Sequence, residues 1–137
     1  MKKQLFALVG LGLLLATASA YAQSTLIKAN VPFDFVVDQR IMPAGEYTVE
    51  SLGSSTAALL IRSLDQNAKS LVITHDCESS KSSGSPKLVF HRYGNSYFLA
   101  QVWKVGATSG REIPRSRREA EMAIASAAYN VAVAALR

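Results

Sequence analysis

Runs of β-branched and aromatic residues alternate with turn-forming residues along most of the chain. These runs occupy residues 25–37, 45–49, 57–64, 70–75, 87–93 and 96–103. Short apolar runs bounded by Gly, Pro, Asn, Asp and Ser are typical of β-strands. Pro32 has no backbone N–H and interrupts the first run, which therefore predicts two short strands or one bent edge strand. The pattern as a whole predicts a mainly β fold.

The spacing of these runs predicts two antiparallel hairpins. The third and fourth runs are separated by the turn-forming segment 65–68, and the last two runs are separated by Gly94 and Asn95 alone. Glycine in the first position of a two-residue loop predicts a type II′ turn. The facing pairs expected in this last hairpin are Arg92 and Tyr97, Phe90 and Leu99, Leu88 and Gln101, His91 and Phe98, and Val89 and Ala100. Both faces are largely apolar, so we expect the hairpin to lie centrally and to be covered on both sides.

The C-terminal segment predicts a helix. Ser116 and Glu119 have the spacing of a capping box, which places the start of the helix near Arg117. The sequence beyond is alanine-rich almost to Arg137, and its apolar residues recur at helical spacing. This stripe consists of Met122, Ala125, Tyr129, Val133 and Leu136. We expect the stripe to pack on the sheet or on a second copy of the chain, which would make a homo-oligomer.

The N-terminus has the three-part layout of a signal peptide. Lys2 and Lys3 precede an uncharged apolar run at 5–15, and two A-x-A sites follow. The run is shorter than the roughly 20 residues that a membrane-spanning helix needs. We therefore expect cleavage after Ala22 or after Ala20, and export of the chain to the periplasm or the extracellular space. No transmembrane span is expected in the mature chain.

These elements predict one folded domain after the signal peptide. We expect a signal peptide at 1–22, a β domain at 23–114 and a helix at 115–137 that packs on this domain or on a partner. The predicted fold is an antiparallel β-sandwich or a small β-barrel of about seven strands with one C-terminal α-helix. The serine-rich segment 77–86 is expected to be a mobile surface loop.

Charge and cysteine content narrow the functional classes. The chain has 15 Lys and Arg against 10 Asp and Glu, and loss of the first 22 residues leaves a mild basic excess. The densest cluster is Arg111, Arg115, Arg117 and Arg118, which lacks the interleaved aromatic residues of a single-strand binder. We expect a solvated patch there and no nucleic-acid partner. Cys77 is the one cysteine, so no intrachain disulfide is available.

Candidate catalytic chemistry is sparse in the sequence. His75, Asp76, Cys77 and His91 are the residues that could ligate a transition metal, but C-x-x-C and H-x-x-x-H spacings are absent. There is also no G-x-S-x-G elbow and no glycine-rich phosphate loop. We therefore expect no metal and no cofactor. The alternative is a small secreted hydrolase or metal-dependent enzyme that uses His75 or His91.

The best candidate for ligand binding is an arginine surrounded by aromatic residues, Arg92 with Tyr93, Tyr97 and Trp103. Aromatic side chains beside an arginine can hold a sugar ring, a peptide or an anion. The competing interpretation is that Arg92 stacks on Tyr97 and caps the end of the hairpin. We expect a non-catalytic module with a binding or structural role, whose partner is a protein, glycan or lipid of the cell envelope.

An ordered set of sequence blocks resembles a family of small exported bacterial proteins of unknown function. The blocks are VPFDFVV (31–37), PAGEYTV (43–49), LIRS (60–63), LVFHRYG (88–94), YFL (97–99) and GREIPRSRRE (110–119). They span roughly residues 29–121, most of the mature chain. The resemblance implies export and a compact β domain, and it offers no known activity to carry over to this chain.

Overall fold

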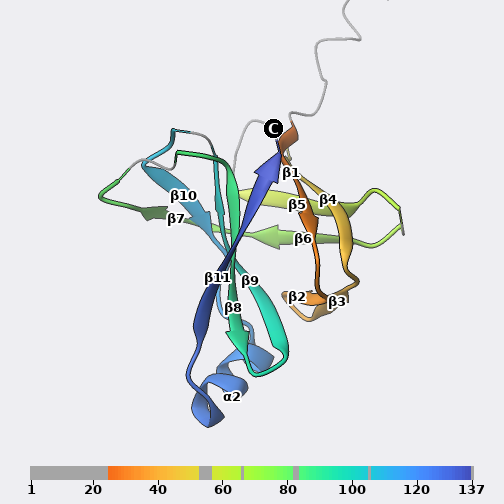
Figure 1. Ribbon diagram of the computed structural model, residues 1–137, viewed down its shortest axis with the longest axis vertical. Coiled ribbons are helices and arrows are strands. Elements are labelled where there is room, and N and C mark those ends of the chain that lie inside the picture. The colour runs from red at the N-terminus through yellow and green to blue at the C-terminus, as the bar shows by residue number, and fades with distance from the viewer. Residues whose placement is uncertain (1–24, 53–56, 66, 82–83, 105, 137) are drawn as a thin grey trace, which may run out of the picture.

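The computed structural model describes residues 25–52, 57–65, 67–81, 84–104 and 106–136 (Figure 1). The predicted signal peptide lies outside these residues, and export stays a prediction. The described elements are β1 (Thr25–Val31), β2 (Phe35–Val37), β3 (Arg40–Met42), β4 (Gly45–Ser51), β5 (Ala58–Ser63), β6 (Lys69–Ile73), β7 (His75–Glu78), β8 (Lys87–Tyr93), β9 (Ser96–Trp103), β10 (Ser109–Glu112), α2 (Arg117–Ala125) and β11 (Tyr129–Leu136).

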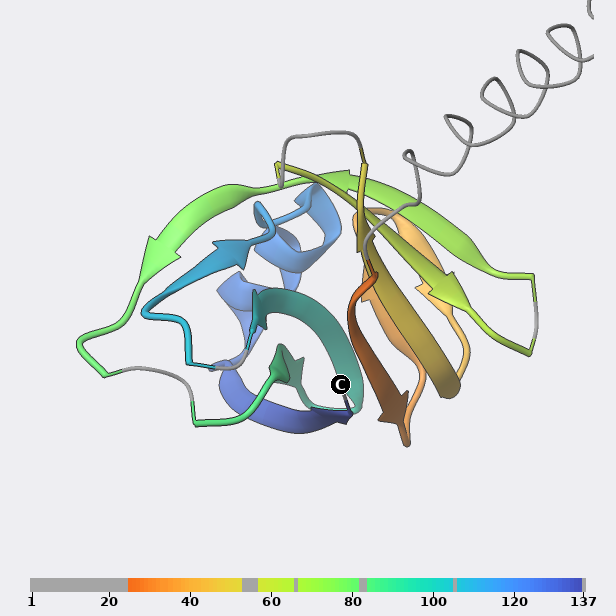
Figure 2. The same ribbon diagram turned by 90° about the horizontal axis from the view of Figure 1, so that it is seen from above.

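The strands form one curled, barrel-like sheet. Their order is β3-β2-β9-β8-β11-β1-β4-β5-β6, and β10 joins β9 to β7 at the side. Figure 2 shows the early strands and the late strands facing one another across the interior. The mainly β fold with one helix is therefore confirmed for the described residues. The predicted count of about seven strands is wrong, because the sheet has 11 strands. Four of these, β2, β3, β7 and β10, have only three or four residues, too few to show a periodic pattern.

Both predicted hairpins are present. β5 pairs antiparallel with β6, and β8 pairs antiparallel with β9. Gly94 has a φ of 60°, the left-handed conformation that the predicted turn requires at this position. The expected register holds for Arg92, His91 and Phe90, and then shifts at an irregularity between Val89 and Phe90. Because of this β-bulge, Leu88 lies opposite Val102 and Val89 opposite Gln101, one position away from their predicted partners.

The two apolar faces of the β8–β9 hairpin are covered on both sides, as the sequence predicts. One face contributes Leu88 and Phe90 to the main core, which extends to β1, β4 and β5. The opposite face is covered by α2, which lies at the hairpin end of β8 and β9 (Figure 1). This smaller core consists of Val36, Tyr93 and Phe98, with Met122 and Ala123 packed against it.

The predicted C-terminal helix is only partly correct. The helix begins at Arg117 with Ser116 as its N-cap, and the Ser116 hydroxyl accepts a hydrogen bond from the Glu119 backbone N–H at 3.2 Å. It ends at Ala125, however, and the rest of the segment forms β11 between β8 and β1. The prediction of a helix to Arg137 is therefore wrong. β11 pairs with β8 along residues 129–134 and with β1 at residues 135–136, and its inward residues join the core, which outweighs the helix propensity of alanine.

The serine-rich segment also departs from the expected loop. Its first residues, Cys77 and Glu78, belong to β7 and pair with Gly110 and Ser109 of β10. Of the remaining loop, residues 82–83 lie outside the described part of the chain. In the described part of the chain, α2 is too short and too polar to cross a membrane, and no other helix there is long and apolar enough to do so.

Candidate binding site

The four residues of the predicted binding patch do not form one surface. Arg92 and Tyr97 lie opposite one another on β8 and β9, with the guanidinium carbon 5.4 Å from the centroid of the tyrosine ring. Tyr93 points to the other face, because successive residues of a strand alternate, and it is buried under α2. Trp103 is buried at the far end of β9, where its ring contacts the backbone of Gly110. Only half of the patch is therefore a candidate site.

A residue that the sequence interpretation missed completes the surface. Tyr129 is the first residue of β11, and the register places it directly opposite Arg92. Residues facing one another in antiparallel strands lie on the same face of a sheet. Tyr97, Arg92 and Tyr129 therefore form a row across β9, β8 and β11, which we call the Tyr–Arg–Tyr row. The missed signal was the alternation of β-branched Val131 and Val133, which indicates a strand rather than a helix.

The row is held in place by the aromatic core beneath it. The ring of Tyr97 stacks on Phe33, with centroids 3.8 Å apart. Phe33 in turn makes an edge-to-face contact with Phe90, which is fully buried. Tyr129 at the other end of the row is 67% exposed, so its ring is accessible to a ligand. The row thus combines one ring that is held by packing, that of Tyr97, with one solvent-exposed ring, that of Tyr129.

Arg92 is oriented between these two tyrosines. Its Nε donates a hydrogen bond to the carbonyl oxygen of Gly94 at 2.7 Å. None of the ion pairs in the described part of the chain involves Arg92. A guanidinium carries five N–H donors, and the Nη1 and Nη2 end presents two of them side by side for a carboxylate or phosphate. The hydrogen bond to Gly94 uses Nε and leaves this end for a ligand.

A hollow of about 470 Å³ adjoins the row. It is lined by Arg92, Gly94, Tyr129 and Val131, so one cation faces a largely apolar wall. Its volume lies within the range of about 300–1,000 Å³ that small-molecule sites occupy. The arrangement suits a ligand with a flat apolar face for Tyr129 and an anionic group for Arg92.

His91 is engaged in a buried contact with the helix. Its Nδ1 lies 2.7 Å from Oε1 of Glu119, a carboxylate in the first turn of α2 that is 4% exposed. The hydroxyl of Tyr93 donates to the same oxygen at 3.1 Å. Desolvation of the phenol, together with this hydrogen bond and the nearby carboxylate charge, raises the pKa of Tyr93. The three side chains fasten α2 to the sheet.

The other candidate chemical groups lie elsewhere. His75 and Cys77 are on β7, which pairs with β10, whereas His91 is on β8. Burial, and secondarily the charge of Glu112, raises the pKa of the Cys77 thiol. Among the described residues, no three or more His, Cys, Asp and Glu side chains are grouped as a metal site would require. The hydrolase or metal-enzyme alternative stays a prediction.

Most of the predicted basic cluster has acidic or polar partners. Arg111 forms an ion pair with Asp76 and donates to Thr74 through both its Nε and its Nη2. Arg115 lies 3.9 Å from Glu119, and Arg117 pairs with a glutamate one turn along the helix. These contacts join β10 to β7 and to Thr74, the residue between β6 and β7, and they stabilise the start of α2.

No family model, curated protein or solved structure matches the chain. The resemblance to a family of small exported bacterial proteins therefore stays a prediction.

Proposed function

We propose that the protein is an exported, non-catalytic binding module and that the Tyr–Arg–Tyr row is its ligand site. The observation that supports this is an arginine oriented by Gly94, without a carboxylate partner in the described residues, beside an exposed tyrosine and a hollow. An exposed, ordered cation next to an open aromatic ring is a common way to hold a ligand that is both flat and charged. The signal-peptide pattern of the sequence supports the exported location.

The ligand class that fits best is an acidic glycan built from sugars that carry a carboxylate. The C–H face of a pyranose can pack on the ring of Tyr129, since tyrosine combines a large apolar face with a polar tip. The sugar carboxylate can then accept two parallel hydrogen bonds from the Nη1 and Nη2 end of Arg92. This pairing selects acidic over neutral sugars, because only an acidic sugar supplies the opposite charge.

The test is a calorimetric titration of the protein from residue 23 onward with oligogalacturonate and with a neutral oligosaccharide of the same length. We expect the acidic glycan to bind at least about tenfold more tightly than the neutral one. This ratio corresponds to a difference of about 1.4 kcal/mol in binding free energy. Arg92→Gln should remove this preference, because glutamine cannot make the charged bidentate contact. Tyr129→Ala should weaken both glycans, because it removes the aromatic platform.

Arg117→Gln is the matched control, because Arg117 is a highly exposed arginine on α2, and α2 packs on the other face of the β8–β9 hairpin. It should leave both affinities unchanged. Arg92→Gln should change the free energy of unfolding by less than about 1 kcal/mol, the size of an exposed cation–π contact. Equal binding of acidic and neutral glycans, or equal effects of Arg92→Gln and Arg117→Gln, would contradict the proposed site.

A further inference from the structure

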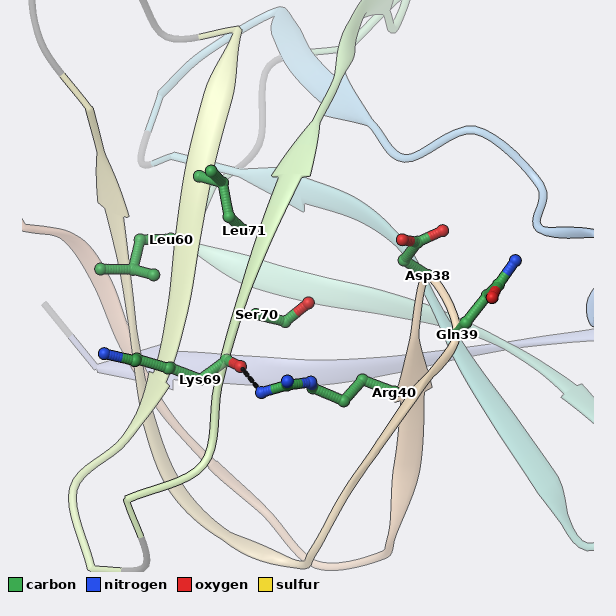
Figure 3. Close-up of a pocket in the computed structure, with 7 residues that line it drawn as sticks. All are labelled: Asp38, Gln39, Arg40, Leu60, Lys69, Ser70 and Leu71. Atoms are coloured by element: carbon green, nitrogen blue, oxygen red, sulfur yellow. Dashed lines mark hydrogen bonds between the residues drawn. The ribbon is translucent and has the colours of Figure 1, made fainter.

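The curled sheet is open along a seam between its two edge strands, β3 and β6. In the described part of the chain, β3 pairs with β2 alone and β6 pairs with β5 alone. The seam is crossed by a side chain: Nη1 of Arg40 donates to the backbone carbonyl of Lys69 at 2.8 Å (Figure 3). One arginine thus occupies a position where a neighbouring strand would otherwise make a backbone hydrogen bond.

The backbone direction of β6 follows from its contacts. The carbonyl of Ala68 accepts a hydrogen bond from the N–H of Ser63, and the N–H of Thr74 donates one to the carbonyl of Ala57, each at 2.7 Å. The backbone groups of Ala68 and Thr74 therefore point toward β5. Residues of an antiparallel strand alternately direct their N–H and C=O groups toward and away from a given partner. The intervening odd-numbered residues, Lys69, Leu71 and Ile73, therefore direct theirs into the seam. The Arg40 contact with the Lys69 carbonyl agrees with this direction.

The side chains along the seam are unusually apolar for a free edge. Leu71 is 55% exposed and Ile73 is 60% exposed on β6, and Ile41 of β3 is 60% exposed. Natural edge strands are usually protected from pairing by lysine, proline or a bulge. On β6 the charged residue is Lys69, at the first position of the strand. An exposed apolar edge with unpaired backbone groups is the surface that accepts an added strand.

A hollow of about 450 Å³ lies beside this edge. Figure 3 shows Leu60 and Leu71 on the β5–β6 hairpin, with Arg40 extending from the opposite side toward Lys69. The lining contains two cationic residues, Arg40 and Lys69, and one acidic residue, Asp38, which lies in the turn between β2 and β3. The neighbouring Arg62 has its own carboxylate partner, Glu50, at 2.6 Å. The rim of the hollow therefore carries a positive charge.

We infer that the edge of β6 binds an extended, acidic segment of a partner protein as an added β-strand. The charge of the seam selects this occupant over a second copy of the chain, because an antiparallel β6–β6 pair centred on Leu71 would place each Lys69 opposite Ile73 of the other copy, without an opposite charge. A carboxylate on the incoming strand would instead pair with Lys69. The Lys69 carbonyl oxygen would then accept a hydrogen bond from a backbone N–H of the incoming strand in place of the one from Arg40.

The register predicts the sequence pattern of the partner. Residues that face one another across paired strands share a sheet face, so the incoming strand should carry apolar residues opposite Ile73 and Leu71 and an acidic residue opposite Lys69. An antiparallel partner therefore reads apolar-x-apolar-x-acidic, and a parallel partner reads acidic-x-apolar-x-apolar.

The experiment uses the protein from residue 23 onward and a fluorescent peptide with the core Val-Thr-Val-Thr-Glu, together with its reversed sequence. We expect one of the two to bind, and its binding to slow amide hydrogen exchange at Leu71 and Ile73. Exchange at Ser70 and Val72 should change little, since their N–H groups already face β5. Replacing the peptide glutamate by lysine should weaken binding at least about tenfold, and Lys69→Glu should reverse that preference.

N-methylation of the peptide tests the backbone pairing without altering the protein. Two methylated peptides are compared, one with methyl groups on the odd-numbered backbone nitrogens and one with them on the even-numbered ones. One of these peptides should not bind and the other should bind as before, because only every second N–H faces β6. The inference would be overturned if the two methylated peptides bound equally well, or if neither the forward nor the reversed peptide bound. It would also be overturned if the protein associated with itself through β6 in place of binding the peptide. Arg92→Gln should leave peptide binding intact, so this site and the proposed glycan site succeed or fail independently.

Discussion

At the scale of single residues, Gly110 illustrates how space rather than backbone conformation can require glycine. A Cβ atom built on Gly110 would lie 2.7 Å from Cδ2 and 2.8 Å from Cε3 of Trp103. Both contacts are closer than van der Waals distance, and Trp103 is only 6% exposed, so its ring has little room to move. The pair joins β9 to β10 at the end of the sheet away from the Tyr–Arg–Tyr row.

Gly110→Ala should therefore lower the free energy of unfolding by about 1–3 kcal/mol, the usual cost of overpacking. The measurement is a urea denaturation series followed by tryptophan fluorescence and circular dichroism. Gly84→Ala is the control, because a Cβ there meets no atom within 4 Å. A Trp103→Leu background should reduce the cost of Gly110→Ala. Similar effects of the two glycine substitutions would show that the tryptophan ring does not set the requirement.

Tyr47 gives the domain a predictable sensitivity to alkaline pH. Its side chain is buried, its hydroxyl donates to the carbonyl of Pro43, and burial together with the charge of Asp34 raises its pKa to about 12. A raised pKa in the folded state stabilises the fold below the unfolded-state value of about 10, and this contribution is lost as the pH rises toward about 12.

We therefore expect the urea midpoint of the wild-type protein to fall between about pH 10 and about pH 12. Tyr47→Phe should cost about 0.5–1.5 kcal/mol at neutral pH through loss of the hydrogen bond, and it should flatten the alkaline fall. Part of the fall should persist, because the pKa of Tyr93 is also raised. An identical pH profile for wild type and Tyr47→Phe would contradict the assignment to Tyr47.

At the scale of elements, α2 and β11 divide a segment that the sequence presents as one helix. α2 is attached by the buried carboxylate of Glu119 and by Met122 and Ala123, while Ile124 is 89% exposed. The helix is therefore a cover for one face of the β8–β9 hairpin. β11 has the larger structural role, because it lies between β8 and β1 and connects the two halves of the sheet.

Truncation of the chain after Ala128 should consequently abolish cooperative unfolding. It removes the strand that pairs with both β8 and β1 and exposes two new edges of the sheet. The measurement is thermal unfolding by circular dichroism together with the dispersion of the amide NMR spectrum. Val133→Asp and Ala132→Asp form a matched pair of substitutions in β11. Val133→Asp should destabilise the domain more than Ala132→Asp, because Val133 packs against the core and Ala132 is exposed. A truncated chain that unfolds cooperatively would contradict this role.

At the scale of the whole molecule, the first and last described strands pair with one another. Ala29 of β1 lies opposite Ala135 of β11, so the sheet cannot be completed before nearly the whole chain is available. The sheet closes at this point and stays open at the seam between β3 and β6. The row and the seam are built from different strands, the row from β9, β8 and β11 and the seam from β3 and β6. The proposed glycan site and the proposed strand-addition site therefore do not compete for the same strands.

The sequence by itself determined the features that depend on neighbouring residues. The β5–β6 and β8–β9 hairpins, the glycine turn at Gly94, and the start of α2 at its Ser116 cap all follow from short-range patterns. Such features are stabilised within a few residues of chain, by turn conformation, alternation and capping. For the same reason the sequence correctly placed Arg92 beside Tyr97.

The tertiary structure alone decided the features that depend on distant partners. Whether 129–136 is a helix or a strand is set by the free edges of β8 and β1, which lie far away along the chain. That choice brought Tyr129 to Arg92 and separated both from Tyr93 and Trp103. The open seam at Lys69 and Arg40 likewise exists because two edges meet without pairing. Strand pairing is selected by long-range packing rather than by intrinsic preference, and a local pattern cannot reveal it.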